Sequence, residues 1–168
     1  GDSLPMGLIW EYDLYGSIVS HACGTDACPA ESEFLAEEIQ SAACAGSYTH
    51  KVTLVLDGGN INDGTFNQLA YEGAAASCTA AADCCLEVDV VDDDVESPLS
   101  GGSGADVKFF CEVEYAAQDS EMVIGVGFLH EQAVHRAGFC ASTNSSVAQH
   151  YAIVDVAYFG TNALSNTN

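Results

Sequence analysis

The chain has 168 residues, enough for one domain with a real core, and 48% of them are hydrophobic. Only three residues are basic against 25 acidic ones, so the formal net charge is −22. A charge of this sign repels phosphate backbones and anionic lipid headgroups, which makes nucleic acid and membrane surfaces poor partners. We interpret the acidity as a source of solubility.

Residues 1–50 are predicted to form an N-terminal appendage that disulfides attach to the rest of the chain. Residues 8–15 are rich in aromatic side chains and are predicted to form an extra strand. Residues 31–43 are predicted to form a helix, because Leu35 and Ile39 lie at helical spacing and acidic residues precede them.

Residues 51–168 are predicted to form an α/β domain, because β-rich runs alternate with helical patterns. The predicted strands are residues 52–56, 86–91, 122–126 and 151–156. The predicted helices are residues 65–77, 105–117 and 129–137, and residues 92–104 form a solvated acidic loop. This order predicts a three-layer parallel sheet with helices on both faces.

Eight cysteines form an even set, which indicates a disulfide-stabilised protein from an oxidising compartment, either extracellular or of the periplasmic type. They are Cys23, Cys28, Cys44, Cys78, Cys84, Cys85, Cys111 and Cys140. Their number allows many pairings, and we assign none. No CxxC pair is present, so a zinc site is not expected. The sequon at Asn144 is a candidate glycosylation site and agrees with secretion, and no apolar run has the ~20 residues of a membrane span.

The run at residues 54–73 reads LVLDGGNINDGTFNQLAYEG, an apolar strand followed by a glycine-rich turn and a helical pattern. A P-loop would need a Gly-Lys-Ser/Thr sequence, and no lysine follows the turn. The glycines do not have the GxGxxG spacing of a dinucleotide site. A calcium loop aligned on Gly64 would place Gly59 and Ile61 at ligand positions, where carboxylates are needed. All three familiar loops are therefore excluded.

A carboxylate, an aromatic ring and an amide remain in this run as candidate ligand-binding groups. Asp57 ends the predicted strand, while Phe66 and Asn67 begin the predicted helix, with Thr65 and Gln68 at capping-box spacing. Parallel sheets place ligands at this edge, and such groups suit a heterocycle or another small polar solute. The alternative is that Asp57 caps a turn, Phe66 packs in the core and Asn67 is an ordinary helix residue.

The segment KVTLVLDGGNINDGTFNQLAYEGAAAS, residues 51–77, resembles the basic membrane lipoprotein family, the purine nucleoside receptors of bacterial ABC importers. Asn62 stands where the family usually has aspartate, and Thr65 where it has serine. Three later stretches are also similar, in the same order: VDDDVESP at 91–98, MVIGVGFLHEQA at 122–133 and YAIVDVAY at 151–158.

The resemblance implies one lobe, the N-terminal one, of a type I periplasmic binding fold. It further implies that Asp57 and Asn67 hydrogen-bond the base of a purine nucleoside and that Phe66 stacks on it. Gln132 falls where the family has an aspartate near the ribose. Family members have two such lobes, so a second lobe or another protein chain would complete the cleft.

Two functions follow from these observations. The first is a non-catalytic, extracellular solute-binding domain for a nucleoside or similar small polar ligand, without cofactor or metal. The second is a secreted structural or interaction module that assembles with itself, as a homo-oligomer, or with other chains. Enzymatic activity is not expected, because the five histidines are scattered and none lies beside a recognisable nucleophile.

Overall fold

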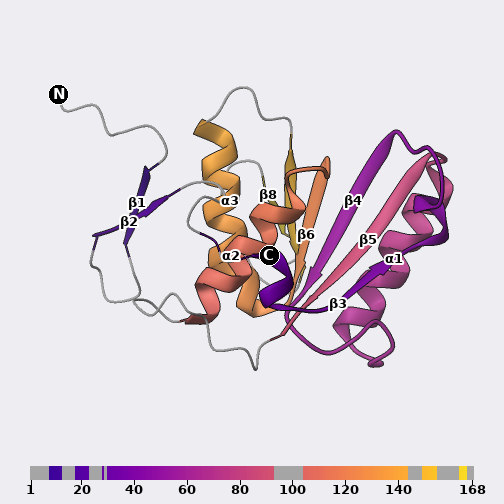
Figure 1. The fold of residues 1–168 in the computed structure, drawn as a ribbon, viewed down its shortest axis with the longest axis horizontal. Helices are drawn as coiled ribbons and strands as arrows, with labels where there is room; N and C mark the ends of the chain where they lie inside the picture. The colour runs from indigo at the N-terminus through magenta and orange to yellow at the C-terminus, as the bar shows by residue number, and fades with distance from the viewer. Residues whose placement is uncertain are drawn as a thin grey trace.

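The computed structural model describes residues 8–12, 18–22, 28, 30–92, 104–143, 149–154 and 163–165. At its centre is a six-stranded sheet with the strand order β3-β5-β4-β6-β7-β8 (Figure 1). The strands are β3 (Leu35–Gln40), β4 (His50–Leu56), β5 (Cys84–Val91), β6 (Met122–Val126), β7 (His150–Val154) and β8 (Ala163–Ser165). The four predicted strands are confirmed within two residues at the ends that the structure describes.

The sheet is mixed rather than wholly parallel, which corrects the predicted topology. β4 pairs in parallel with β5 on one side and with β6 on the other, and β7 and β8 continue in the same direction. Only β3, at the edge, runs antiparallel to its neighbour β5. The parallel part needs crossover connections, and the helices supply them.

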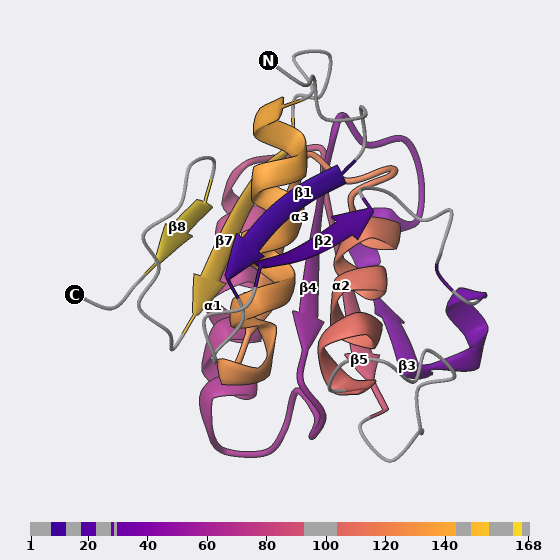
Figure 2. The same ribbon diagram turned by 90° about the vertical axis from the view of Figure 1, so that its left-hand side faces the viewer.

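Helices cover both faces of the sheet, as predicted. α1 (Phe66–Ala80) lies on one face, and α2 (Gly104–Ala116) and α3 (Glu131–Thr143) lie side by side on the other (Figures 1 and 2). Three short 3₁₀ segments accompany them: η2 (Glu31–Glu33), η3 (Ala42–Cys44) and η4 (Phe128–His130). The chain therefore has an α/β architecture of three layers.

Alternation along the central strands produces two hydrophobic cores. In β4, Leu54 and Leu56 pack with the α1 side, whereas Val55 points to the opposite face and packs with α2 and α3. All three side chains are fully buried. Because both faces are covered, the strand reads as a continuous apolar run instead of an alternating one.

The predicted helix over residues 31–43 is wrong. These residues form η2, the edge strand β3 and η3. Ile39 packs against the α1-side core, whereas Glu38 and Gln40 point to the other face, which is the two-residue period of a strand. Pairing with the exposed edge of β5 outweighs the helical spacing of Leu35 and Ile39.

A separate two-stranded ribbon precedes the main sheet. β1 (Leu8–Tyr12) pairs antiparallel with β2 (Ile18–Ala22), which confirms a strand in the first part of the predicted segment 8–15. The ribbon lies outside the helical layer, with β1 against α3 (Figure 2). The division of the chain at residue 50 stays a prediction, although β3 belongs to the main sheet.

Three disulfides join described residues and confirm the oxidised set. Cys28–Cys111 ties the N-terminal segment to α2, and Cys44–Cys85 ties η3 to β5. Cys78–Cys84 closes the short turn between α1 and β5. Cys140 is disulfide-bonded as well. Cys23, Asn144 and residues 93–103 of the predicted acidic loop lie outside the described residues.

Candidate ligand site at the carboxyl edge of the sheet

The candidate site lies where the sheet changes its winding direction. From β4 the chain crosses through α1 to β5 on one side, whereas β6, on the other side of β4, is reached through α2 on the opposite face. The carboxyl ends of β4 and β6 therefore flank a topological switch point. Open α/β sheets bind ligands in the crevice at such a point, because the loops diverge there.

Asp57 and Gly127 meet at this switch point. Each directly follows its strand, β4 or β6, and the Asp57 carboxyl group lies against the Gly127 backbone. A Cβ atom on Gly127 would overlap the carboxyl atoms of Asp57, and the φ of Gly127 is +102°. Glycine is thus required here for space and for backbone conformation, and it fixes the half-buried Asp57 at the strand end.

Asn67 holds the loop that follows Asp57. Its side chain is 8% exposed, and its Nδ2 donates a hydrogen bond of 2.9 Å to the carbonyl oxygen of Gly58. A Cβ atom on Gly59 would lie 2.8 Å from the same nitrogen, so the loop passes close above the amide. Asn67 is consequently a positioning residue in this structure, with its carbonyl oxygen as the group that remains for a ligand.

The first turn of α1 is capped by Asp63 rather than by the predicted capping box. The Oδ1 atom of Asp63 accepts hydrogen bonds from the backbone nitrogens of Thr65 (2.7 Å) and Gln68 (3.4 Å). The Thr65 side chain makes no capping bond, although Thr65 is the N-cap residue, as predicted. Hydrogen bonds from the side chain and backbone of Thr65 lower the pKa of Asp63. A charged carboxylate thus faces the positive end of α1.

Phe66 is exposed, which rules out a role in the core. Its side chain is 56% exposed, and Leu69, one turn later on α1, is 66% exposed. Residues three apart on a helix are neighbours, so these two exposed apolar side chains lie next to each other on one face of α1. The first turn of α1 therefore presents an unburied aromatic ring next to Asn67.

Gln132 lies in the first turn of α3, after β6, and thus its backbone is at the same edge of the sheet as Asp57. Its side chain is outside what the structure describes. The structure places Asp57 against Gly127 and ties Asn67 to Gly58, the residue after Asp57, whereas the ring of Phe66, the first residue of α1, is exposed. Sequence reasoning missed Gly127, although a glycine directly after the apolar run 122–126 was the signal for it.

His130 lies below this edge but is not accessible to a ligand there. The ring is fully buried and packs edge-on against Phe109 with 4.6 Å between the ring centroids. Burial lowers the pKa of His130 to about 3, so the imidazole is neutral at physiological pH. A buried, neutral ring in an apolar setting fits packing rather than proton transfer.

Neither a metal centre nor a membrane span is found among the described residues. No group of three or more His, Cys, Asp or Glu side chains there is arranged to hold a metal ion. Of the helices that the structure describes, none combines the length and apolar composition that crossing a membrane requires. No family model matches the chain, and neither a curated protein nor a solved structure matches it.

Proposed function

We propose that this chain is a secreted, non-catalytic solute-binding domain that holds a nucleoside-like ligand at the carboxyl edge of β4 and β6. The observation that carries the proposal is the placement of Asp57 at the topological switch point; the exposed ring of Phe66, at the start of the helix that follows, supports it. In this proposal the fold is one lobe of a type I periplasmic binding fold, as the resemblance of residues 51–77 implies.

The roles of the groups follow from their chemistry. The Asp57 carboxylate accepts hydrogen bonds from the ring N–H or amino groups of a base. The Phe66 face stacks on the base, which removes both apolar surfaces from water. Asn67 contributes its carbonyl oxygen while its Nδ2 keeps the loop in place through Gly58. Gln132 keeps the role that the resemblance implies, an amide for a sugar hydroxyl.

Binding of purine nucleosides by titration calorimetry tests the proposal. We expect inosine or adenosine to bind, and we expect Asp57→Asn and Phe66→Ala to weaken binding at least tenfold. Leu69→Ala is the matched control, because Leu69 is as exposed as Phe66 but lies one turn from the strand ends. No binding by the native protein, or equal losses in all three variants, would contradict the proposal.

The same exposed pair supports a second candidate function, an extracellular module that assembles with a second lobe, another chain or a copy of itself. Phe66 and Leu69 form a small exposed apolar patch on α1 that a protein partner would cover. Disulfides among the described residues suit such a role outside the cell.

Light scattering distinguishes the two functions. Assembly predicts a native particle larger than one chain, and it predicts that Leu69→Ala and Phe66→Ala reduce the particle mass alike. A monomeric native particle whose nucleoside affinity depends on Phe66 but not on Leu69 would favour the solute-binding function.

A further inference from the structure

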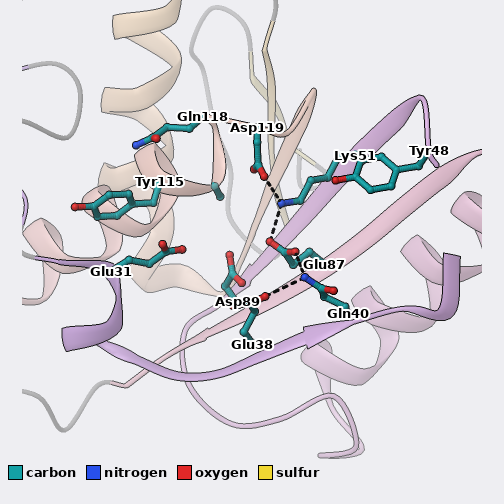
Figure 3. Close-up of a pocket in the computed structure, with 11 residues that line it drawn as sticks. Glu31, Glu38, Gln40, Tyr48, Lys51, Glu87, Asp89, Tyr115, Gln118 and Asp119 are labelled. Atoms are coloured by element: carbon teal, nitrogen blue, oxygen red, sulfur yellow. Dashed lines mark hydrogen bonds and ion pairs between the residues drawn. The ribbon is translucent and has the colours of Figure 1, made fainter. Parts of the chain in front are cut away.

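A cleft lies on the α2 side of the sheet, beside the edge strand β3, and shares no lining residue with the candidate nucleoside site. It is an open cleft of about 400 Å³ between β3, the start of β4, β5 and the C-terminal end of α2 (Figure 3). The cleft extends from Lys51, near the start of β4, to Asp89 of β5, which pairs with Val55 of β4. Small-molecule sites in proteins have similar volumes.

Carboxylates dominate the lining of this acidic cleft. The acidic residues that line it are Glu31, Glu38, Glu87, Asp89 and Asp119. The one basic residue of the lining is Lys51. Five acids against one base leave an excess of four carboxylates in a space that one small molecule would fill.

Lys51 shows how the cleft holds an ammonium group. Its side chain is only 7% exposed, and its Nζ lies 2.8 Å from Glu87 Oε1 and 2.7 Å from Asp119 Oδ2. Burial lowers the pKa of Lys51, but hydrogen bonds and charge interactions with the two carboxylates outweigh it and raise the pKa overall. At one end of the cleft, two carboxylates therefore already bind the ammonium group of Lys51 (Figure 3).

The other end of the cleft contains a buried carboxyl group, that of Asp89. Asp89 is 2% exposed and points into the cleft beside Glu31 and Glu38 (Figure 3). Behind it on α2 lies Glu112, which is fully buried and whose carboxyl group is close to that of Asp89. Two buried acids in contact are costly when both are charged, unless one keeps its proton or a cation compensates them.

Burial and the charge of neighbouring acids raise the pKa of both Asp89 and Glu112. Burial and the neighbouring acids Glu87, Glu31 and Glu38 raise the pKa of Asp89 to about 7, while Glu112 lowers it by hydrogen bonding. Burial and the charge of Asp89 raise the pKa of Glu112 to about 10, so Glu112 keeps its proton at physiological pH. Binding of a cation would therefore favour the ionised form of Asp89.

We propose that the acidic cleft binds a small organic polyamine, with one ammonium group at Asp89 and its neighbours Glu31 and Glu38, at the end of the cleft away from Lys51. No group of described acidic side chains is arranged to hold a metal ion, whereas an elongated amine can span the separate carboxylates of the cleft. The rings of Tyr48 and Tyr115 line the same cleft and offer faces to a cation. This inference is independent of nucleoside binding.

Titration calorimetry with spermidine and 1,4-diaminobutane tests the proposal. We expect both to bind, and we expect Glu38→Gln and Asp89→Asn to weaken spermidine binding at least tenfold. Glu37→Gln is the matched control, because it removes the same charge from the adjacent position of β3, and Glu37 does not line the cleft. Nucleoside affinity should not change in any of these variants.

The outcomes separate specific binding from attraction by the net charge. If Glu37→Gln and Glu38→Gln lower the spermidine affinity by similar factors, then spermidine is attracted only by the net negative charge. That result would overturn the proposal. The absence of spermidine binding to the native protein would overturn it too.

The affinity for spermidine should rise between pH 6 and pH 8, because Asp89 ionises in this range. The charged or titratable groups that surround Asp89 are Glu112, Glu87, Glu31, Glu38, Asp119 and Lys51. Circular dichroism melting establishes that each variant is folded, and Glu38, being exposed, keeps the test valid if Asp89→Asn does not fold.

Discussion

Gly127 decides where the Asp57 carboxylate lies, because any side chain on Gly127 would occupy the same space. We predict that Gly127→Ala lowers the free energy of unfolding by about 2–4 kcal/mol, through positive-φ strain and the overlap with Asp57. Urea denaturation measures this change.

Gly64→Ala separates the two causes. Gly64 also has a positive φ, +74°, but an added Cβ atom would meet nothing within 4 Å. This control should therefore cost only the backbone strain, about 1–2 kcal/mol. Equal costs for the two variants would mean that the contact with Asp57 does not matter.

The buried acids Asp89 and Glu112 predict a loss of stability at alkaline pH. Their folded-state pKa values, about 7 and about 10, lie above the ordinary values of the unfolded chain. The folded protein therefore binds more protons, and the associated stability is complete below about pH 4 and is lost as the pH rises through these values.

Glu112→Gln should flatten this dependence, because the amide stays neutral. At pH 9 and without added amines, we predict that the variant is more stable than the native chain by on the order of 1–3 kcal/mol. Urea denaturation between pH 5 and pH 9 measures the slopes. A Glu112→Gln slope as steep as that of the surface control Glu37→Gln would contradict the burial argument.

Single residues were the least predictable part of the candidate site. The sequence predicts Asp57 at a strand end and Asn67 at a helix start, because apolar runs and turn residues mark both positions. It cannot predict that Asn67 bonds to Gly58 or that Asp63 replaces Thr65 as the cap. Those contacts depend on how the glycines bend the loop in three dimensions.

At the scale of elements, the disulfides differ in how much chain they close. Cys28–Cys111 spans 83 residues in sequence, whereas Cys78–Cys84 spans only six. Loop-closure entropy assigns about 4–5 kcal/mol to the first and about 2–3 kcal/mol to the second. Cys44–Cys85 lies within the larger loop and shortens it, which reduces the first figure.

We therefore predict that the double variant Cys28→Ala/Cys111→Ala is less stable than Cys78→Ala/Cys84→Ala. Urea denaturation of both proteins, with the remaining disulfides intact, gives the comparison. Greater destabilisation from removing Cys78–Cys84 would show that the turn between α1 and β5 depends on its bridge more than on chain entropy.

The strands that are buried on both faces could be predicted from the sequence, whereas the edge strand β3 could not. β4 and β6 are apolar runs of strand length, which few alternatives fit. β3 is an edge strand with Glu38 and Gln40 on its exposed positions, so its sequence carries little apolar periodicity. Its strand conformation comes from pairing with β5, a long-range contact that a local pattern does not contain.

For the whole molecule, the net charge of −22 sets how stability responds to salt. Repulsion among the carboxylates disfavours the compact state, and salt screens it over about 10 Å at 0.1 M. We predict that Tm rises by about 5 °C or more when sodium chloride increases from 20 mM to 500 mM.

Differential scanning calorimetry measures this shift, with an equal osmolarity of an uncharged solute as the control. A Tm that stays constant or falls with salt would mean that ion pairs such as Lys51–Glu87 outweigh the repulsion.

Backbone amide shifts during titration with inosine test the proposed function most directly, because they detect weak binding and place it on the chain. We predict that the largest shifts fall on Gly58, Gly59, Asn67 and Gly127, at the carboxyl edge of β4 and β6, and that Asp57→Asn abolishes them. No shifts at millimolar inosine, or shifts confined to residues away from that edge, would contradict the proposed function.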